Sequence, residues 1–242
     1  MASKTLNMIS AAVAGLAVAT ASAAVYGNLR LRRQLRQVKA ALVVSRHAAT
    51  HDALTGLVNR AGMDAHLAIC AAAGQPVWVL LVDLDGFKPV NDVHTHAAGD
   101  AVLVEVARRL SRVTDLRRDL VGRLGGDEFL IVSEAGDAPA ACGLARMVVA
   151  VLRRPVTVGS TVRVQVSASV GWVQMRPGDA AGDVLHTADA AMYRAKAAGG
   201  DRQAAWGLDE PLLKVEVARP GNRRRDSHPH RVPAESTVVI TR

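Results

Sequence analysis

The chain has 242 residues, room for one domain of ordinary size with terminal extensions, and half of them are apolar, which suffices for a hydrophobic core. The net charge of +8 lies in the two ends: residues 1–50 hold seven Lys/Arg and no Asp/Glu, residues 203–242 hold seven and five, and residues 51–202 hold 16 and 17. A central region of charge −1, in a chain with 3% aromatic residues, is not expected to bind nucleic acid.

The first element is the uncharged, alanine-rich segment Leu6–Gly27. At about 1.5 Å per residue, a helix of this length crosses the hydrocarbon core of a bilayer. Only Lys4 precedes it, whereas several basic residues follow it, so residues 1–27 are predicted to be a single-pass anchor in the inner (cytoplasmic) membrane, with the following domain in the cytoplasm. Two other interpretations stay open: a signal peptide cleaved near Ala21-Ser22-Ala23, and an alanine-rich soluble helix.

Residues 28–51 are predicted to form a linker helix. Apolar or small residues recur there at alternating steps of four and three, which is the heptad spacing of a coiled coil. The pattern covers fewer than three heptads, so it fits either a dimerising stalk or one helix lying on the domain or on the membrane. The recurring residues are Leu31, Leu35, Val38, Leu42, Ser45 and Ala49.

The central region shows strand patterns first. Val77–Leu84 is a short apolar run with β-branched residues, typical of a buried strand. Residues 120–124 and 129–132 are predicted as two strands that Gly125-Gly126 joins in a tight hairpin. Residues 162–173 are strand-like, with a break expected near Ala168.

Helical periodicity appears between these strands, at residues 97–114, 138–152 and 184–198. The last of these helices is expected to end at Gly199-Gly200. Strands that alternate with helices around a tight hairpin indicate an α+β fold, in which a mixed, mostly antiparallel central sheet is flanked by helices.

The C-terminal residues 203–242 hold four of the nine prolines and a run of three arginines, without any sustained period. We predict a mostly disordered basic tail, solvated or in contact with anionic lipid. The two cysteines, Cys70 and Cys142, are far apart in sequence and are expected to be small core residues rather than a redox pair.

Two acidic stretches carry the candidate chemistry. Asp83 stands at the end of the predicted strand Val77–Leu84, and Asp127-Glu128 stands at the predicted hairpin tip. Carboxylates brought together there could hold Mg²⁺, which prefers oxygen ligands and substrate phosphates, and a metal pair would support in-line phosphoryl transfer. Lys88 could neutralise charge on a phosphate. Each stretch alone also fits an ordinary turn, so their joint presence matters.

Five stretches, in order and at family-like spacing, resemble the motifs of GGDEF-domain diguanylate cyclases. The family patterns are D-x-L-T-G-L-x-N-R, D-x-D-x-F-K-x-x-N-D, H-x-x-G-D-x-x-L, the Gly-Gly-Asp-Glu-Phe signature, and A-D-x-A-x-Y-x-A-K. The matching stretches are residues 52–60, 83–92, 96–103, 123–129 and 188–196.

The resemblance implies a nucleotide-cyclase, palm-like GGDEF fold over residues 52–202 and an enzyme that condenses two GTP molecules into cyclic di-GMP. It implies Mg²⁺, with Mn²⁺ as an alternative, bound by Asp83, Asp127 and the carbonyl of Leu84. It also implies that Asp127 accepts the proton of the 3′-hydroxyl and that Glu128 supports a second metal. Because each domain would hold one GTP, a homodimer is implied.

The remaining site residues follow from the same resemblance. Lys88 matches a transition-state stabiliser and Lys196 a phosphate contact. Asn91 and Asp100 match the pair that recognises guanine, and His96 matches a further substrate contact. Guanine offers N1–H and N2–H₂ donors that a carboxylate accepts, and adenine lacks this pair, which would explain a preference for GTP.

Three positions depart from the family pattern. Thr95 stands where glycine is frequent, and Gly200 stands where an arginine helps to hold phosphates, with Arg202 two places later. Leu116 replaces the arginine of the R-x-x-D product site whose aspartate is Asp119. Weaker GTP binding and weak or absent product inhibition are therefore expected. The alternative function is a catalytically weak or silent GGDEF domain that binds nucleotide or a partner protein in signalling.

Overall fold

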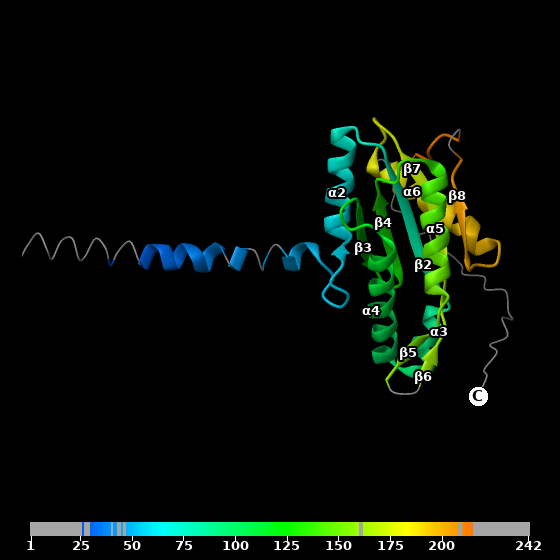
Figure 1. Cartoon of the computed structure of the whole chain (residues 1–242), viewed down its shortest axis with the longest axis horizontal. Coiled ribbons are helices and arrows are strands. Elements are labelled where there is room, and N and C mark those ends of the chain that lie inside the picture. Colours follow the sequence, from blue (N-terminus) through cyan, green and yellow to red (C-terminus); the bar gives the residue numbers. More distant parts are fainter. Residues whose placement is uncertain are drawn as a thin grey trace, which may run out of the picture.

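The computed structural model describes residues 26, 30–39, 41–42, 45, 47–159, 162–207 and 210–214. Within this part of the chain, six strands form one sheet in the order β1-β3-β4-β2-β7-β8, shown in Figure 1. The pairs β2–β4, β2–β7 and β3–β4 are antiparallel, whereas β1–β3 and β7–β8 are parallel. The strands are β1 (Val58–Asn59), β2 (Val77–Asp85), β3 (Asp119–Gly125), β4 (Glu128–Ser133), β7 (Ser167–Met175) and β8 (Arg202–Ala205).

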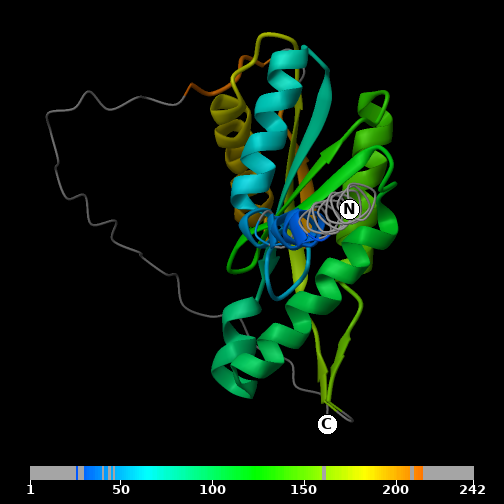
Figure 2. The ribbon, with the colours of Figure 1, turned by 90° about the vertical axis from the view of Figure 1, so that its left-hand side faces the viewer.

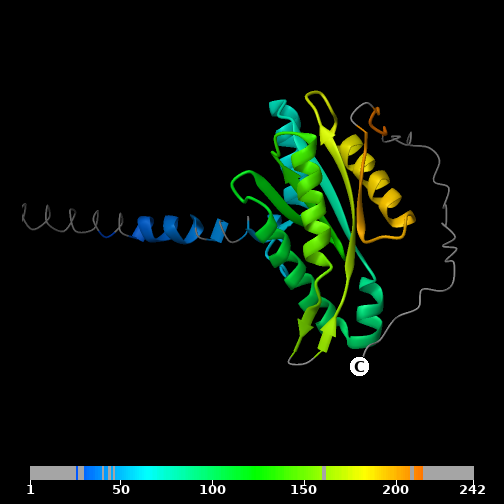
Figure 3. The same ribbon diagram turned by 45° about the vertical axis from the view of Figure 1, so that its right-hand side comes forward.

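Helices cover both faces of this sheet. Figure 3 shows α6 on one side and α4 and α5 on the other, while the short α3 follows the end of β2. A separate ribbon of β5 (Val156–Val158) and β6 (Val162–Val164) extends from the domain. The predicted α+β fold with a mixed, mostly antiparallel sheet is confirmed. The helices are α2 (Arg60–Ala73), α3 (Phe87–His94), α4 (His96–Val113), α5 (Ala138–Leu152) and α6 (Ala181–Ala197).

The central strand β2 divides the core in two. Because side chains alternate along a strand, Leu80 and Val82 pack with α4 and α5, whereas Val79 and Leu81 pack with α2 and α6. Burial on both faces explains why this strand is a continuous apolar run. Asp83 continues the face that points towards α2 and α6, which places a carboxylate near the C-terminal end of this central strand.

Helix α6 lies unusually close to β7. A Cβ atom added to Gly171 would lie 2.1 Å from the backbone nitrogen of Met192 and 2.2 Å from the carbonyl oxygen of Ala188. Only glycine therefore permits this approach, and α6 buries Val184, Ala188 and Met192 against the sheet. The contact fixes the position of Lys196 near the end of the same helix.

The hairpin and the long helices were predicted well, and α5 has the predicted bounds. The break expected near Ala168 lies earlier, between β6 and β7. Residues 203–205, which fall within the predicted disordered tail, instead belong to β8 and extend the sheet, and the following Trp206 is buried. The backbone nitrogen of Trp206 donates to the carbonyl of Trp172 (2.8 Å), so pairing with β7 orders this segment.

The described residues of the predicted linker are helical from 30 to 39, at 41, 42 and 45, and from 47 to 50. In Figure 1 this helix, in blue, projects away from the domain, and Figure 2 views it end-on. Its heptad side chains Leu31, Leu35, Val38 and Leu42 are about half exposed or more. The predicted anchor Leu6–Gly27 lies outside the described residues except for Tyr26, and no described helix is long and apolar enough to span a bilayer.

Thr95, between α3 and α4, has φ 127° and ψ 158°. A β-branched residue in this region is strained by about 1–3 kcal/mol. We expect Thr95→Gly to raise the free energy of unfolding by about 1 kcal/mol, because relief of strain exceeds the added entropy of the unfolded chain. Urea unfolding measures this. Thr157→Gly, in strand β5 with negative φ, is the matched control and should be destabilising; equal losses in both variants would contradict the strain.

Glu105 on α4 titrates far below its usual range. Hydrogen bonds and charge from Arg108 and Arg109 lower its pKa from 4.5 to about 2, despite partial burial. A lowered pKa in the folded state gives stability that is fully present above about pH 4.5 and is lost as the pH falls towards 2. As the pH is lowered from about 4.5 to 2, the urea midpoint of the wild type should fall, and we expect it to fall less in Glu105→Gln. A wild-type slope in the variant would contradict this assignment.

Candidate active site

Acidic groups meet where β2 ends beside the hairpin of β3 and β4. Asp83 of β2 is opposite Glu128 of β4 in the sheet register, and Asp127 lies in the turn just before Glu128. The backbone nitrogen of Leu84 donates to the carbonyl of Asp127 (3.3 Å), which ties the hairpin tip to the end of β2. The predicted meeting of the two acidic stretches is thus present in the fold.

Asp83 is 8% exposed and interacts with Lys196 from the last turn of α6. The Nζ–Oδ1 distance is 2.8 Å. Burial raises the pKa of Asp83, and the nearby Asp127 and Asp85 raise it further, while Lys196 opposes the shift. A buried carboxylate in such surroundings needs a cation beside it.

A cavity of about 510 Å³ opens over these groups. This lies within the roughly 300–1,000 Å³ typical of small-molecule sites. Two lysines, Lys88 on α3 and Lys196 on α6, line it together with two carboxylates, Asp83 and Asp127. Lys196 is the lysine that pairs with Asp83. The lining residues are Asp83, Leu84, Asp85, Gly86, Phe87, Lys88, Pro89, Asp127, Lys196, Gly199 and Gly200.

Asp85, which also lines this cavity, has a structural role. Its carboxylate accepts hydrogen bonds from Ser169 Oγ (2.8 Å), Ser167 Oγ (3.2 Å) and the backbone nitrogen of Asp201 (2.8 Å). It therefore fastens the end of β2 to the start of β7 and to the turn after α6. Both oxygens of Asp85 therefore already accept hydrogen bonds from hydroxyl and backbone groups, whereas the neighbouring Asp83 pairs with a lysine.

Glu128 is held by Arg60 at the start of α2, with an Nη2–Oε2 distance of 3.4 Å. Burial raises the pKa of Glu128, and Arg60 acts in the opposite direction. Glu128 does not line the cavity among the described residues, although Asp83 and Asp127 on either side of it do. That Glu128 supports a second metal ion therefore stays a prediction.

The predicted guanine contacts lie at the corner between α3 and α4. Asn91 of α3 packs against Gly99 of α4, since a Cβ atom there would meet the Asn91 Oδ1 atom at 2.0 Å. His96 and Asp100, in the first turns of α4, are exposed. None of these three residues lines the cavity among the described residues, so their role stays a prediction.

The first motif connects the linker helix to the hairpin. Asp52 accepts from Thr55 Oγ1 (2.6 Å) and pairs with Arg123 of β3 (3.1 Å). Burial alone would raise the pKa of Asp52, but these hydrogen bonds outweigh it and lower the pKa. Arg123 also donates to the carbonyl of Gly126 (2.8 Å) in the hairpin turn. Asn59 caps α2 and donates to the carbonyl of Ala49 in the linker helix (3.0 Å).

Sequence reasoning gave no role to Arg60 or Arg123. Both stand inside matched motifs, so the signal was present, but their partners are 68 and 71 residues away along the chain. The pairing of β1 with β3 brings these segments together.

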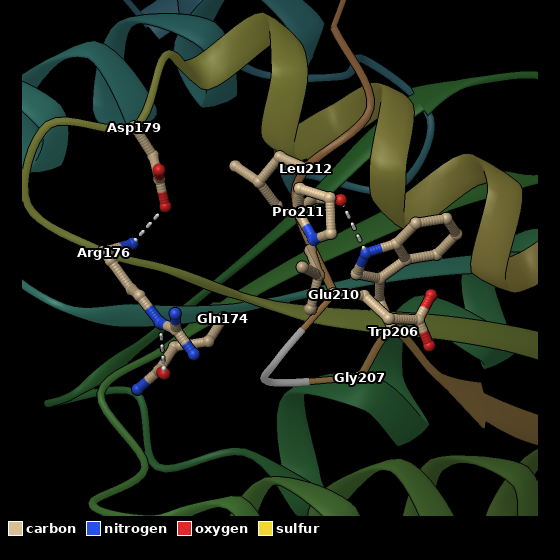
Figure 4. A pocket seen from close by; sticks show the side chains of 9 residues that line it. Gln174, Arg176, Asp179, Trp206, Gly207, Glu210, Pro211 and Leu212 are labelled. Atoms are coloured by element: carbon tan, nitrogen blue, oxygen red, sulfur yellow. Dashed lines mark hydrogen bonds between the residues drawn. The ribbon is translucent and has the colours of Figure 1, made fainter.

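A second, smaller cavity of about 160 Å³ lies at the opposite end of β7, beneath the C-terminal segment. Figure 4 shows Trp206 beside Pro211 on one side of it and Arg176 with Asp179 on the other, and the Trp206 Nε1 donates to the Pro211 carbonyl (3.2 Å). Arg194 stacks over the Trp206 ring at 4.1 Å. The cavity holds no cluster of carboxylates and lysines like that of the larger one.

Comparison with known proteins decides the family. Residues 49–202 match the family described as "Diguanylate cyclase, GGDEF domain". The chain belongs to the GGDEF family. The β3–β4 hairpin, which carries the Gly-Gly-Asp-Glu-Phe motif, is therefore the family's signature region, and Asp83 at the end of β2 lies beside it.

Curated relatives include diguanylate cyclases. The chain is 37% identical over 182 residues to diguanylate cyclase TpbB of Pseudomonas aeruginosa, covering 70% of this chain and 40% of that protein. It is 43% identical over 159 residues to the bifunctional diguanylate cyclase/cyclic di-GMP phosphodiesterase MucR of the same species, covering 62% and 22%. The chain thus spans less than half the length of these relatives.

Solved structures agree. The coiled coil and GGDEF domain of DgcB from Caulobacter crescentus, in complex with c-di-GMP, superposes with a TM-score of 0.66 at 28% identity, covering 72% of this chain and 94% of that one. The GGDEF domain of PA1120 (TpbB or YfiN) from P. aeruginosa gives 0.60 at 34%, covering 65% and 95%.

Proposed function

We propose that this protein is a diguanylate cyclase that condenses two GTP molecules into cyclic di-GMP and two pyrophosphates. One observation carries the proposal: Asp83, Lys88 and Lys196, from β2, α3 and α6, and Asp127, from the turn of the hairpin, line one cavity of nucleotide size. Family membership and the diguanylate cyclases among its relatives support it.

The donor set fits Mg²⁺. Among the described residues no group of three or more His, Cys, Asp or Glu side chains is arranged to hold a metal ion. Mg²⁺, however, is usually held by one or two carboxylates together with waters and substrate phosphates. Asp83, Asp127 and the carbonyl of Leu84 supply that incomplete set. The metal, when bound, would polarise the α-phosphate and stabilise the charge that develops there.

The protein's own side chains would position the two substrates and balance their charge. Asp127 accepts the proton of a 3′-hydroxyl, whose oxygen attacks the α-phosphorus of the other GTP; the bond from that phosphorus to the bridging oxygen breaks, and pyrophosphate leaves. A second round closes the ring. Lys88 and Lys196 offset the phosphate charge, and Asn91, His96 and Asp100 orient the guanosine. Catalysis of this kind rests on positioning and electrostatics.

Two domains must face each other, so a homodimer is part of the proposal. The exposed apolar residues of the linker helix support a dimerising stalk. We expect Leu35→Glu with Leu42→Glu to lower cyclase activity at least about tenfold at low protein concentration and to lower the fraction of dimer, because the seam would carry like charges. Full activity in a monomer would contradict the stalk. The membrane anchor at residues 1–27 stays a prediction.

The product site is predicted to be weak. Leu116 is 68% exposed and has no charge, while Asp119 already accepts from Ser133 Oγ (2.6 Å) and the backbone nitrogen of Asp115 (2.9 Å). We expect added cyclic di-GMP at tens of micromolar to leave the initial rate nearly unchanged. Inhibition that Asp119→Ala abolishes would contradict this prediction.

The deciding experiment supplies GTP and Mg²⁺ to the purified protein and separates the products by chromatography. We expect cyclic di-GMP and pyrophosphate in a ratio of one to two. A well-folded dimer that binds GTP and makes no product would favour the alternative, a silent GGDEF domain that acts by binding.

A further inference from the structure

The turn after α6 is firmly held. Gly199 N donates to the Lys196 carbonyl (3.0 Å) and Gly200 N to the Ala195 carbonyl (3.1 Å). Asp201 N donates to the Asp85 carboxylate (2.8 Å). Two of the turn's residues, Gly199 and Gly200, also line the large cavity, so the turn forms part of its rim.

The other side of this turn is anchored to α5. Arg153, at the end of that helix, pairs with the Asp201 carboxylate at 2.8 Å. Strand β8 begins at the next residue, where Arg202 pairs with Ser169 of β7. The backbone of Arg202 is therefore fixed from both sides.

The side chain of Arg202 folds back over this turn. Its Nε donates to the carbonyl of Gly200 (2.9 Å), and its Nη2 atom is 3.6 Å from the place of a Cβ atom on Gly199. The side chain is exposed, and none of the described carboxylates forms an ion pair with it. A guanidinium with free N–H groups thus lies against the two glycines of the rim.

An arginine at position 200 would not fit this turn. Gly200 has φ 68°, and a Cβ atom on it would lie 2.9 Å from Asp85 Oδ2, an atom that Ser167 and Asp201 hold in place. The family pattern has its phosphate-holding arginine at this place, so the chain must supply a cation from elsewhere or do without one.

We propose that Arg202 binds the β- or γ-phosphate of GTP, taking over from the arginine absent at position 200. This rests on the proposed cyclase function. Lys88 and Lys196 line the cavity, whereas Arg202 lies against its rim residues Gly199 and Gly200 and would be the third cation that a bound triphosphate meets. A guanidinium suits this task, since it presents several N–H donors in a planar fork and is always charged.

The test compares Arg202→Ala with the wild type in the full chain, using GTP as substrate and GMP as a competing ligand. We expect the KM for GTP to rise about tenfold, with kcat within about threefold and the inhibition constant of GMP unchanged, since GMP lacks the outer phosphates. Tenfold corresponds to about 1.4 kcal/mol. Arg202→Lys should recover part of the loss. The matched control is Arg176→Ala, at the opposite end of β7, and it should change none of these values.

The outcomes separate this proposal from the proposed function. A KM in Arg202→Ala equal to that of Arg176→Ala would overturn the role of Arg202 while the cyclase stands. If Arg202→Ala weakened the binding of GMP as much as that of GTP, the proposal would also be overturned. Arg202 would then maintain the shape of the pocket and would not contact the outer phosphates. If the wild type makes no cyclic di-GMP, titration calorimetry with GTP and GMP decides the role of Arg202 by the same comparison.

Discussion

Asp127→Ala is expected to lower the rate of cyclic di-GMP formation by on the order of a thousandfold or more. Asp127 lines the cavity beside Asp83, at the tip of a hairpin tied to β2 through Leu84. Its loss would remove one of the two carboxylates proposed to bind the metal and, with it, the proposed proton acceptor. Several kcal/mol of transition-state stabilisation correspond to that factor.

The fold should survive this change, because Asp127 is half-buried in a turn and its backbone carbonyl, not its side chain, accepts from Leu84. Circular dichroism and urea unfolding check this point. Asp64→Asn, on the exposed side of α2, removes a carboxylate charge elsewhere and should leave the rate unchanged. Cyclase activity within tenfold of the wild type in Asp127→Ala would remove the basis for the proposed site.

Gly171→Ala is expected to lower the free energy of unfolding by about 3 kcal/mol or more. The added methyl group would meet backbone atoms of Met192 and Ala188, which cannot rotate away, so α6 must shift off β7. The buried contacts of Val184 and Met192 would be lost in part, and Lys196 would move relative to Asp83. Cyclase activity should fall with stability.

Gly143→Ala is the matched control for this prediction. Gly143 lies inside α5, and an added Cβ atom there meets nothing within 4 Å. The change should raise stability by up to about 1 kcal/mol, as expected for alanine in a helix interior. Urea unfolding of both variants tests the pair, and an unchanged midpoint in Gly171→Ala would show that α6 is not pressed against β7.

The sequence predicted the elements whose signals are local. The predicted hairpin is present, although its turn is Gly126-Asp127 and not Gly125-Gly126, because Gly125 still pairs with Glu128 as the last residue of β3. Both glycines have positive φ. Helix α5 follows from periodicity alone. Helix α2 was not predicted because Met63, Leu67 and Cys70 are its few buried positions among many alanines. Strand β8 was not predicted because its four residues, Arg202–Ala205, have no strand pattern without β7 beside them.

The same distinction holds for the site. The two acidic stretches could be expected to meet because each follows a recognisable strand, and the motifs resemble a known family. The salt bridge of Lys196 with Asp83 depends on how α6 lies on the sheet, which no local pattern gives. The position of Arg202 depends on a turn that Asp85 and Arg153 hold from different elements. Long-range contacts of this kind appear only with the three-dimensional fold.

The last strand has a practical consequence for fragment design. The family match ends at residue 202, yet Trp206 is buried, Gln203 accepts from the Trp172 indole, and Leu213 N donates to Thr187 of α6 (2.9 Å). A recombinant fragment that ended at residue 202 would lack most of β8. The nine-residue, mostly buried strand β7 would then become the free edge of the sheet. Such edges pair with other chains, so that fragment would be prone to aggregate, and one ending after Lys214 would not.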